Sequence, residues 1–98
     1  MFYSATVQDH IEYLVAGNRH TEPEVLEELA NSVCHKVRAQ VAENPSTPLS
    51  TLMYLANDES SEVRLALSYN YRLPMRLLLR LSNDSSHDLR FGMAENPG

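Results

Sequence analysis

The feature that most constrains this chain is a repeat with a period of 26 residues. Residues 44–70 read NPSTPLSTLMYLANDESSEVRLALSYN, and the flanking sequence follows the same pattern in both directions. The recurring positions include Asn18, Asn44, Asn70 and Asn96, and also Leu29, Leu55 and Leu81. Self-similarity at a period of roughly 20–50 residues is typical of proteins in which similar units stack and bury their apolar faces against one another. The repeat therefore constrains the fold more tightly than it constrains the function.

In each unit the apolar residues follow the spacing of two short amphipathic helices. In the second unit Leu52 and Leu55 belong to one apolar stripe, Val63 and Leu67 belong to the next, and a turn is expected at 57–58. Each predicted helix has about nine residues, fewer than the roughly 12–15 that an isolated helix needs to be even marginally stable in water. The helices must therefore pack against those of neighbouring units. We predict an all-α solenoid of seven short helices.

The repeat divides the chain into an N-terminal half-repeat and three full repeats. The half-repeat covers residues 1–18 and contains one helix, and the repeats cover residues 19–44, 45–70 and 71–96. Because no unit can bury its apolar face alone, we expect a single domain over residues 1–98. The sequence stops where the pattern calls for another unit. We therefore expect either a piece of a longer repeat protein or a chain that dimerises end to end.

Local signals predict how the helices begin and end. Gly17 is expected to end the first helix in a left-handed conformation, and Thr47 is expected to cap a helix whose first residue is Pro48. Val33 and Val37 are four residues apart, so we expect both to face the core.

The composition narrows the class of protein. The formal net charge is −5 with only eight lysines and arginines, whereas nucleic acid and anionic membranes attract a basic surface. No stretch approaches the roughly 18 apolar residues of a membrane span, and we expect no membrane partner. The first residues lack the basic and apolar regions of a signal peptide. Cys34, the single cysteine, excludes an intramolecular disulfide and fits a reducing compartment, so we expect a cytoplasmic protein.

The sequence resembles a known family of helical repeats. The motifs that carry the resemblance are NPxTP at residues 44–48, LAND at 55–58 and VR at 63–64. They are similar to those of the leucine-rich repeat variant, a family related to HEAT-like repeats, over about residues 19–98 and more weakly over 5–18. The resemblance implies a right-handed superhelix of alternating short helices and a binding scaffold. Some members carry an N-terminal cysteine cluster for an iron–sulfur centre, but this sequence has no such cluster, and we expect no cofactor.

On the outer side of the first helix of each unit the sequence stops repeating, whereas the inward positions keep repeating. These outer positions change from acidic through apolar to basic along the three units. The turn at residues 71–72 departs from the expected proline and brings in Tyr and Arg, which are frequent in binding hot spots. The leading interpretation is a non-enzymatic protein–protein interaction module, an adaptor or regulatory scaffold that binds another protein, or a second copy, along this face. The predicted partner-binding residues are Glu24, Glu27, Glu28, Met53, Tyr54, Tyr71, Arg72, Arg76 and Arg80.

A second interpretation is a nucleic-acid or phosphate-binding protein that uses a row of arginines. The row consists of Arg38, Arg64 and Arg90, spaced by 26 residues. Asp58 and Asp84 lie six residues before the second and third of them, and this spacing favours ion pairs within the fold over phosphate binding. Six residues before Arg38 the sequence has Ser32 instead of an aspartate, so we expect Arg38 to lack an ion-pair partner.

The remaining reactive residues do not form a predicted site. The four histidines lack the spacing of zinc ligands, and His35 and His87 lie two repeats apart. Cys34 and His35 are adjacent, so on a helix they point about 100° apart and cannot act as a nucleophile and its base. We therefore expect neither a metal site nor an enzyme.

Overall fold

The structure, a computed structural model, describes residues 3–83, and its side chains are described from residue 7 onward. This part of the chain contains six helices and no strand, which confirms the prediction of an all-α protein. The seventh predicted helix, with Arg90 and Asp84, lies outside the described residues. The helices are α1 (Tyr3–Gly17), α2 (Pro23–Leu29), α3 (His35–Glu43), α4 (Leu49–Leu55), α5 (Ser61–Leu67) and α6 (Met75–Ser82).

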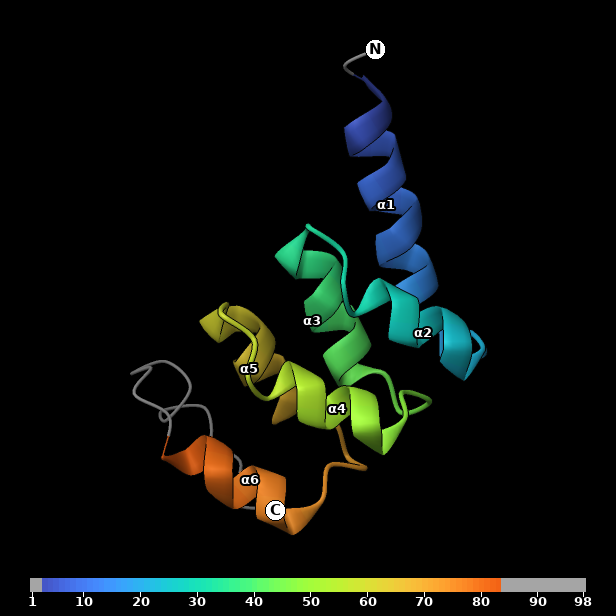
Figure 1. The fold of residues 1–98 in the computed structure, drawn as a ribbon. Helices are drawn as coiled ribbons and strands as arrows, with labels where there is room; N and C mark the ends of the chain where they lie inside the picture. Colours follow the sequence, from blue (N-terminus) through green and yellow to red (C-terminus); the bar gives the residue numbers. More distant parts are fainter. Residues whose placement is uncertain (1–2, 84–98) are drawn as a thin grey trace.

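The helices form two rows. The helices α1, α3 and α5 pack in succession, while α2, α4 and α6 follow one another along the other side (Figure 1). The helix α1 is the longest of the six and extends beyond the rest of the stack (Figure 1). The outward sides of α2, α4 and α6 therefore lie along one side of the stack (Figure 1).

The core lies between the two rows and consists of the predicted apolar stripes. The largest fully buried side chains are those of Leu26, Leu55, Leu67, Leu81, Val37, Val41 and Val63. Small residues at equivalent positions, Ala16, Ala42 and Ser68, are also buried and allow the helices of the first row to approach closely. The sequence thus identified the inner face of most helices correctly.

Val33 is an exception, because 95% of it is exposed although the sequence analysis placed it in the core. The reason is that α3 begins only at His35, so the helical spacing does not extend back to Val33. In the third unit the side chain of Leu77 is buried rather than that of Leu78, which is half-buried.

Two predictions about helix ends are also wrong. The helix α1 ends at Gly17 as predicted, but no described residue has a positive φ, so Gly17 does not adopt the left-handed conformation. Thr47 does not cap α4, because Pro48 occupies the N-cap position. The hydroxyl of Thr47 instead donates a hydrogen bond of 2.7 Å to the carbonyl of Val41, at the end of the preceding helix. Thr47 therefore stabilises the turn between repeats.

Buried asparagines connect successive repeats. The side-chain amide of Asn44 donates to the carbonyl of Ala16 at 2.7 Å and to that of Asn18 at 2.9 Å, and its oxygen accepts from the backbone of Ser46 at 2.9 Å. Both amide protons and the carbonyl oxygen are thus engaged, although the residue is only 2% exposed.

The same arrangement occurs one repeat later. The amide of Asn70 donates to the carbonyls of Ala42 and Asn44, at 2.9 and 3.0 Å. Its oxygen accepts from the backbone of Arg72 at 2.9 Å. The recurrence of asparagine every 26 residues therefore reflects a structural role at the repeat junctions.

Candidate protein-interaction surface

The residues predicted to bind a partner all lie on the exposed surface. Those on the outward sides of α2, α4 and α6 form what we call the outer row. Met53 and Tyr54 are 41% and 58% exposed, and they lie on α4 between acidic and basic ends. The outer row consists of Glu24, Glu27, Glu28, Met53, Tyr54, Arg76 and Arg80, all exposed.

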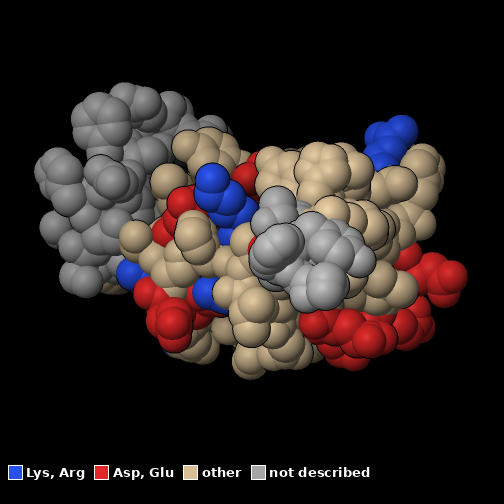
Figure 2. Space-filling model, turned by 90° about the horizontal axis from the view of Figure 1, so that it is seen from above, with Lys and Arg blue, Asp and Glu red and all other residues tan. Residues whose placement is uncertain are grey.

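The acidic end of the outer row is the most strongly charged part. Glu22 precedes α2, Glu24 lies in its first turn, and Glu27 and Glu28 lie one turn later. All four residues are exposed. Figure 2 shows acidic side chains gathered at the lower right, on the side where α2 lies. This end of the molecule therefore attracts positively charged groups.

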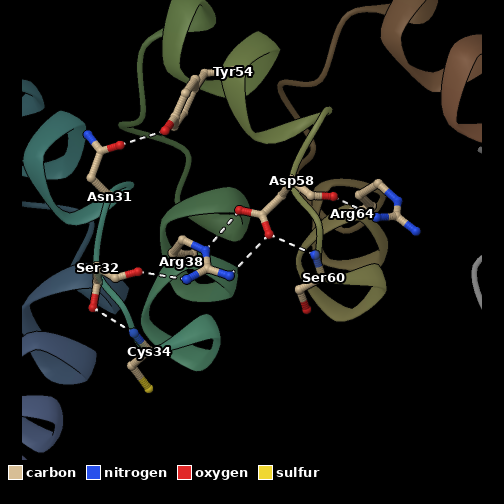
Figure 3. A network of polar contacts seen from close by, with 8 residues as sticks. All are labelled: Asn31, Ser32, Cys34, Arg38, Tyr54, Asp58, Ser60 and Arg64. Carbon is tan, nitrogen blue, oxygen red and sulfur yellow. Dashed lines mark hydrogen bonds and ion pairs between the residues drawn. The ribbon is translucent and has the colours of Figure 1, made fainter.

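Two side chains of the outer row are held in place by asparagines of the preceding unit. The hydroxyl of Tyr54 donates to the side-chain oxygen of Asn31 at 2.6 Å, and Arg80 donates to the side-chain oxygen of Asn57. Figure 3 shows Tyr54 reaching from α4 toward Asn31. These contacts are not among those predicted from the sequence, although the spacing of Asn31 and Asn57 by one period is a signal for them.

The predicted turn residues lie before α6. Tyr71 is 82% exposed, so it does not pack over the repeat junction. The guanidinium of Arg72 donates to the carbonyl of Pro45 at 2.9 Å and thus links the turn to the preceding unit. Tyr71 remains available at the surface, whereas Arg72 has a structural contact.

Arg38 is not without a partner, contrary to the sequence analysis. Its guanidinium donates twice to the carboxylate of Asp58, at 2.8 and 3.2 Å, and once to the carbonyl of Ser32 at 2.7 Å (Figure 3). The hydrogen bond that Arg38 donates to Asp58 is the main reason why the pKa of Arg38 is raised above its ordinary value. Asp58 also accepts from the backbone of Ser60 and offers its own carbonyl to Arg64. Arg38 therefore joins two successive repeats, and Arg64 contacts the turn within its own repeat.

The outer row borders two shallow grooves that meet at Ala30, Asn31 and Tyr54. The larger groove, of about 590 Å³, continues toward Val33, the Arg38–Asp58 pair and Glu59. The smaller groove, of about 260 Å³, lies between α2 and α4. It is lined by Glu27, Ala30, Asn31, Ser50, Thr51 and Tyr54.

A further groove of about 320 Å³ lies across α1, α3 and α5. Tyr13 and Tyr69 stand among its lining residues, together with Lys36 and Glu43. Burial raises the pKa of the Glu43 carboxyl, because desolvation disfavours its charged form. This groove has fewer exposed charged residues than the outer row.

Among residues 3–83 no group of three or more potential ligands could hold a metal ion. Cys34 is half-buried, and its backbone N–H donates to the hydroxyl of Ser32 at 3.2 Å. No helix in this part of the chain is long and apolar enough to cross a membrane.

Short paired helices whose contacts recur every 26 residues define a helical repeat protein. The sequence model of the family described as leucine rich repeat variant matches residues 35–60. This match covers α3, α4 and the turn that follows, and it confirms the resemblance over one period. No curated protein and no solved structure matches the chain with significant similarity.

Proposed function

We propose that this chain is a non-enzymatic protein-interaction module that binds a partner along the outer row. The proposal includes a right-handed solenoid of three repeats that acts as an adaptor or regulatory scaffold in the cytoplasm. Helical repeat proteins generally present extended surfaces to other proteins, and the family match supports this class for residues 35–60.

The observation that carries the proposal is the contrast between the two sides of α2, α4 and α6. The inner positions repeat and are buried, whereas the outer row does not repeat and is exposed. Folding requires none of the exposed identities. The change from glutamates through Met53 and Tyr54 to arginines would orient a partner with opposite polarity, because complementary charges fix the orientation of an encounter.

The contact between Tyr54 and Asn31 adds support. An exposed tyrosine normally loses rotational freedom when a partner binds, at a cost of about 0.5–1.5 kcal/mol. Here the hydrogen bond of 2.6 Å already fixes the ring before binding. A pre-oriented aromatic side chain at the centre of a surface is a suitable anchor for a partner.

Phosphate binding by the arginine row has less support. Arg38 is engaged by Asp58 and Ser32, so its charge is largely neutralised within the fold. Arg64 donates to the carbonyl of Asp58. Binding to nucleic acid would be recognised by a steep loss of affinity with added salt, because phosphate contacts release counterions.

The experiment compares partner capture by the wild-type protein and by two outer-row variants, Tyr54→Ala and the double variant Arg76→Glu/Arg80→Glu. A protein captured from a lysate is then purified, and its Kd is measured by titration calorimetry. We expect Tyr54→Ala to weaken binding about tenfold or more, as for aromatic hot spots. Lys36→Glu on α3 is the control for charge, and we expect it to bind like the wild type.

Circular dichroism at 222 nm establishes that each variant is folded. The proposal is wrong if both outer-row variants fold normally and bind the partner as tightly as the wild type. It is also wrong if the captured ligand is a nucleic acid whose affinity falls steeply with salt.

A further inference from the structure

The smaller groove between α2 and α4 has the chemistry of a site for one positively charged side chain. Its lining combines the carboxylate of Glu27, the ring of Tyr54, the amide of Asn31 and the hydroxyls of Ser50 and Thr51. Glu27 supplies negative charge, and the face of an aromatic ring attracts cations. The groove contains no lysine or arginine among its lining residues.

Thr51 provides a second and independent indication of a ligand. The residue is only 4% exposed, and it lines this groove. Its hydroxyl oxygen is the one buried side-chain polar atom in the described part of the chain that has no hydrogen-bond partner. Buried polar atoms are normally paired, so an exception calls for an explanation. The oxygen is covered by its neighbours, so a donor in the groove supplies the missing partner once the side chains around the oxygen shift.

The position of Tyr54 suits this role. Its hydroxyl donates to the side-chain oxygen of Asn31 at 2.6 Å (Figure 3). This contact holds the ring between the two units, where both grooves meet. The ring is therefore fixed as one wall of the smaller groove before any ligand arrives. The glutamates on α2 extend the negative charge beyond the groove itself (Figure 2).

We propose that this groove, which we call the Tyr54 pocket, binds the side chain of a lysine or arginine from a protein partner. The proposal rests on the proposed function and specifies the partner, namely a segment with an exposed basic residue. Its ammonium or guanidinium group lies against the Tyr54 ring and near the Glu27 carboxylate, where Thr51 accepts one of its protons. The volume of about 260 Å³ admits one such side chain rather than a folded element.

The test uses single blocked amino acids as probes, so it requires no knowledge of the partner. Acetyl-arginine amide and acetyl-lysine amide are titrated into the ¹⁵N-labelled protein. Acetyl-citrulline amide serves as a neutral probe with nearly the shape of arginine. We expect saturable NMR shift changes at Glu27, Asn31 and Thr51 with at least one basic probe, with a Kd on the order of millimolar. The citrulline probe should produce no such localised changes.

Three protein variants sharpen the test. Glu27→Gln should weaken binding of the basic probe about threefold or more, as expected from the loss of a nearby charge. Glu22→Gln removes the same charge from the same end of the molecule but outside the groove, and its side chain makes no cap hydrogen bond. We expect Glu22→Gln to leave the Kd within about 1.5-fold of the wild type, because an exposed charge acts weakly at a distance.

Thr51→Val separates a binding role from a purely structural one. It replaces the unpartnered hydroxyl by a methyl group of similar shape, so the Tm should remain equal or rise while binding of the basic probe weakens. Localised binding of citrulline as tight as that of arginine would contradict the proposal. So would equal effects of Glu22→Gln and Glu27→Gln, or the absence of localised shifts with both basic probes.

Failure of this test is distinguishable from failure of the proposed function. The Tyr54 pocket is tested with single amino acids, whereas the interaction module is tested with a purified partner and the Arg76→Glu/Arg80→Glu variant. If a partner binds the outer row but neither basic probe binds the protein, the proposal of the Tyr54 pocket is wrong and the proposed function still stands.

Discussion

Two rows of asparagine share the same period but occupy different environments. Asn44 and Asn70 form a buried row, whose side chains bind backbone groups of the preceding unit. Asn31 and Asn57 form an exposed row, which accepts hydrogen bonds from Tyr54 and Arg80 on the outer surface. Equal spacing in the sequence thus identifies equivalent positions, but burial decides what each row does. The buried row holds the repeats together, and the exposed row orients side chains of the outer row.

The largest effect is expected from removing a member of the buried row. Asn44→Ala removes the side-chain hydrogen bonds to the carbonyls of Ala16 and Asn18 and from the backbone N–H of Ser46. The carbonyl of Asn18 still accepts from the backbone of Thr21, and an unsatisfied buried group costs about 1–3 kcal/mol, so we expect a loss of roughly 2 kcal/mol or more in the free energy of unfolding. Urea unfolding followed by circular dichroism measures this loss. Asn31→Ala is the matched control, and as an exposed substitution it should change stability by about 0.5 kcal/mol or less. Equal losses in the two variants would remove the distinction between the rows.

The second effect concerns the ion pair that links two units beside the exposed row. Asp58→Ala leaves Arg38 without a carboxylate partner, although the two side chains are only 8% and 14% exposed. We expect a loss of roughly 2–4 kcal/mol, because an uncompensated charge stays mostly buried. The double variant Arg38→Leu/Asp58→Leu should recover much of this stability in the same urea experiment. If Asp58→Ala unfolds like the wild type, the pair does not connect the units.

A smaller effect is expected for the contact between the exposed row and the outer row. Tyr54→Phe removes only the hydroxyl that donates to Asn31. Because both groups are exposed, water replaces the lost partner, and we expect a change of about 0.5 kcal/mol in stability. Thermal unfolding measures this change. A loss as large as that of Asn44→Ala would show that the exposed row is structural as well.

The smallest effect concerns Glu43, which lies on α3 just before the buried row. Burial raises its pKa, so its contribution to stability is present below the ordinary value of about 4.3 and is lost as the pH rises through the folded-state pKa. Glu43→Gln should therefore raise the Tm slightly at pH 7, and this gain should disappear near pH 3. Thermal unfolding at both pH values provides the comparison. A lower Tm of the variant at pH 7 would contradict the prediction.

The sequence predicted the buried stripes because the helical spacing and the period indicate the same positions. Leu55 and Val63 recur in register and are fully buried. Val33 was misplaced because the start of a short helix is set by its turn, and the spacing alone cannot locate that start. Thr47 was misassigned because its hydroxyl has two possible backbone partners, and the preceding helix provides the one that it uses.

The candidate surface was predictable only in part. The outer row followed from positions that face away from the stripe, and the structure places all of its side chains at the surface. The partner of Arg38 was not predictable from local spacing, because Asp58 comes from the next unit, 20 residues along the chain. The pairing of Tyr54 with Asn31 was missed for the same reason, since its residues are 23 positions apart. Contacts between units depend on how the repeats stack, and a single repeat does not contain that information.

The division between the two asparagine rows is tested most directly by hydrogen exchange of asparagine side-chain amides, observed by NMR in the unmodified protein. Both amide protons of Asn44 and of Asn70 are hydrogen-bonded to backbone carbonyls in buried positions. We predict that these protons exchange only when the repeats separate, far more slowly than those of Asn31 and Asn57. Similar exchange rates for all four asparagines would contradict the assignment of the buried row to the repeat junctions and of the exposed row to the surface.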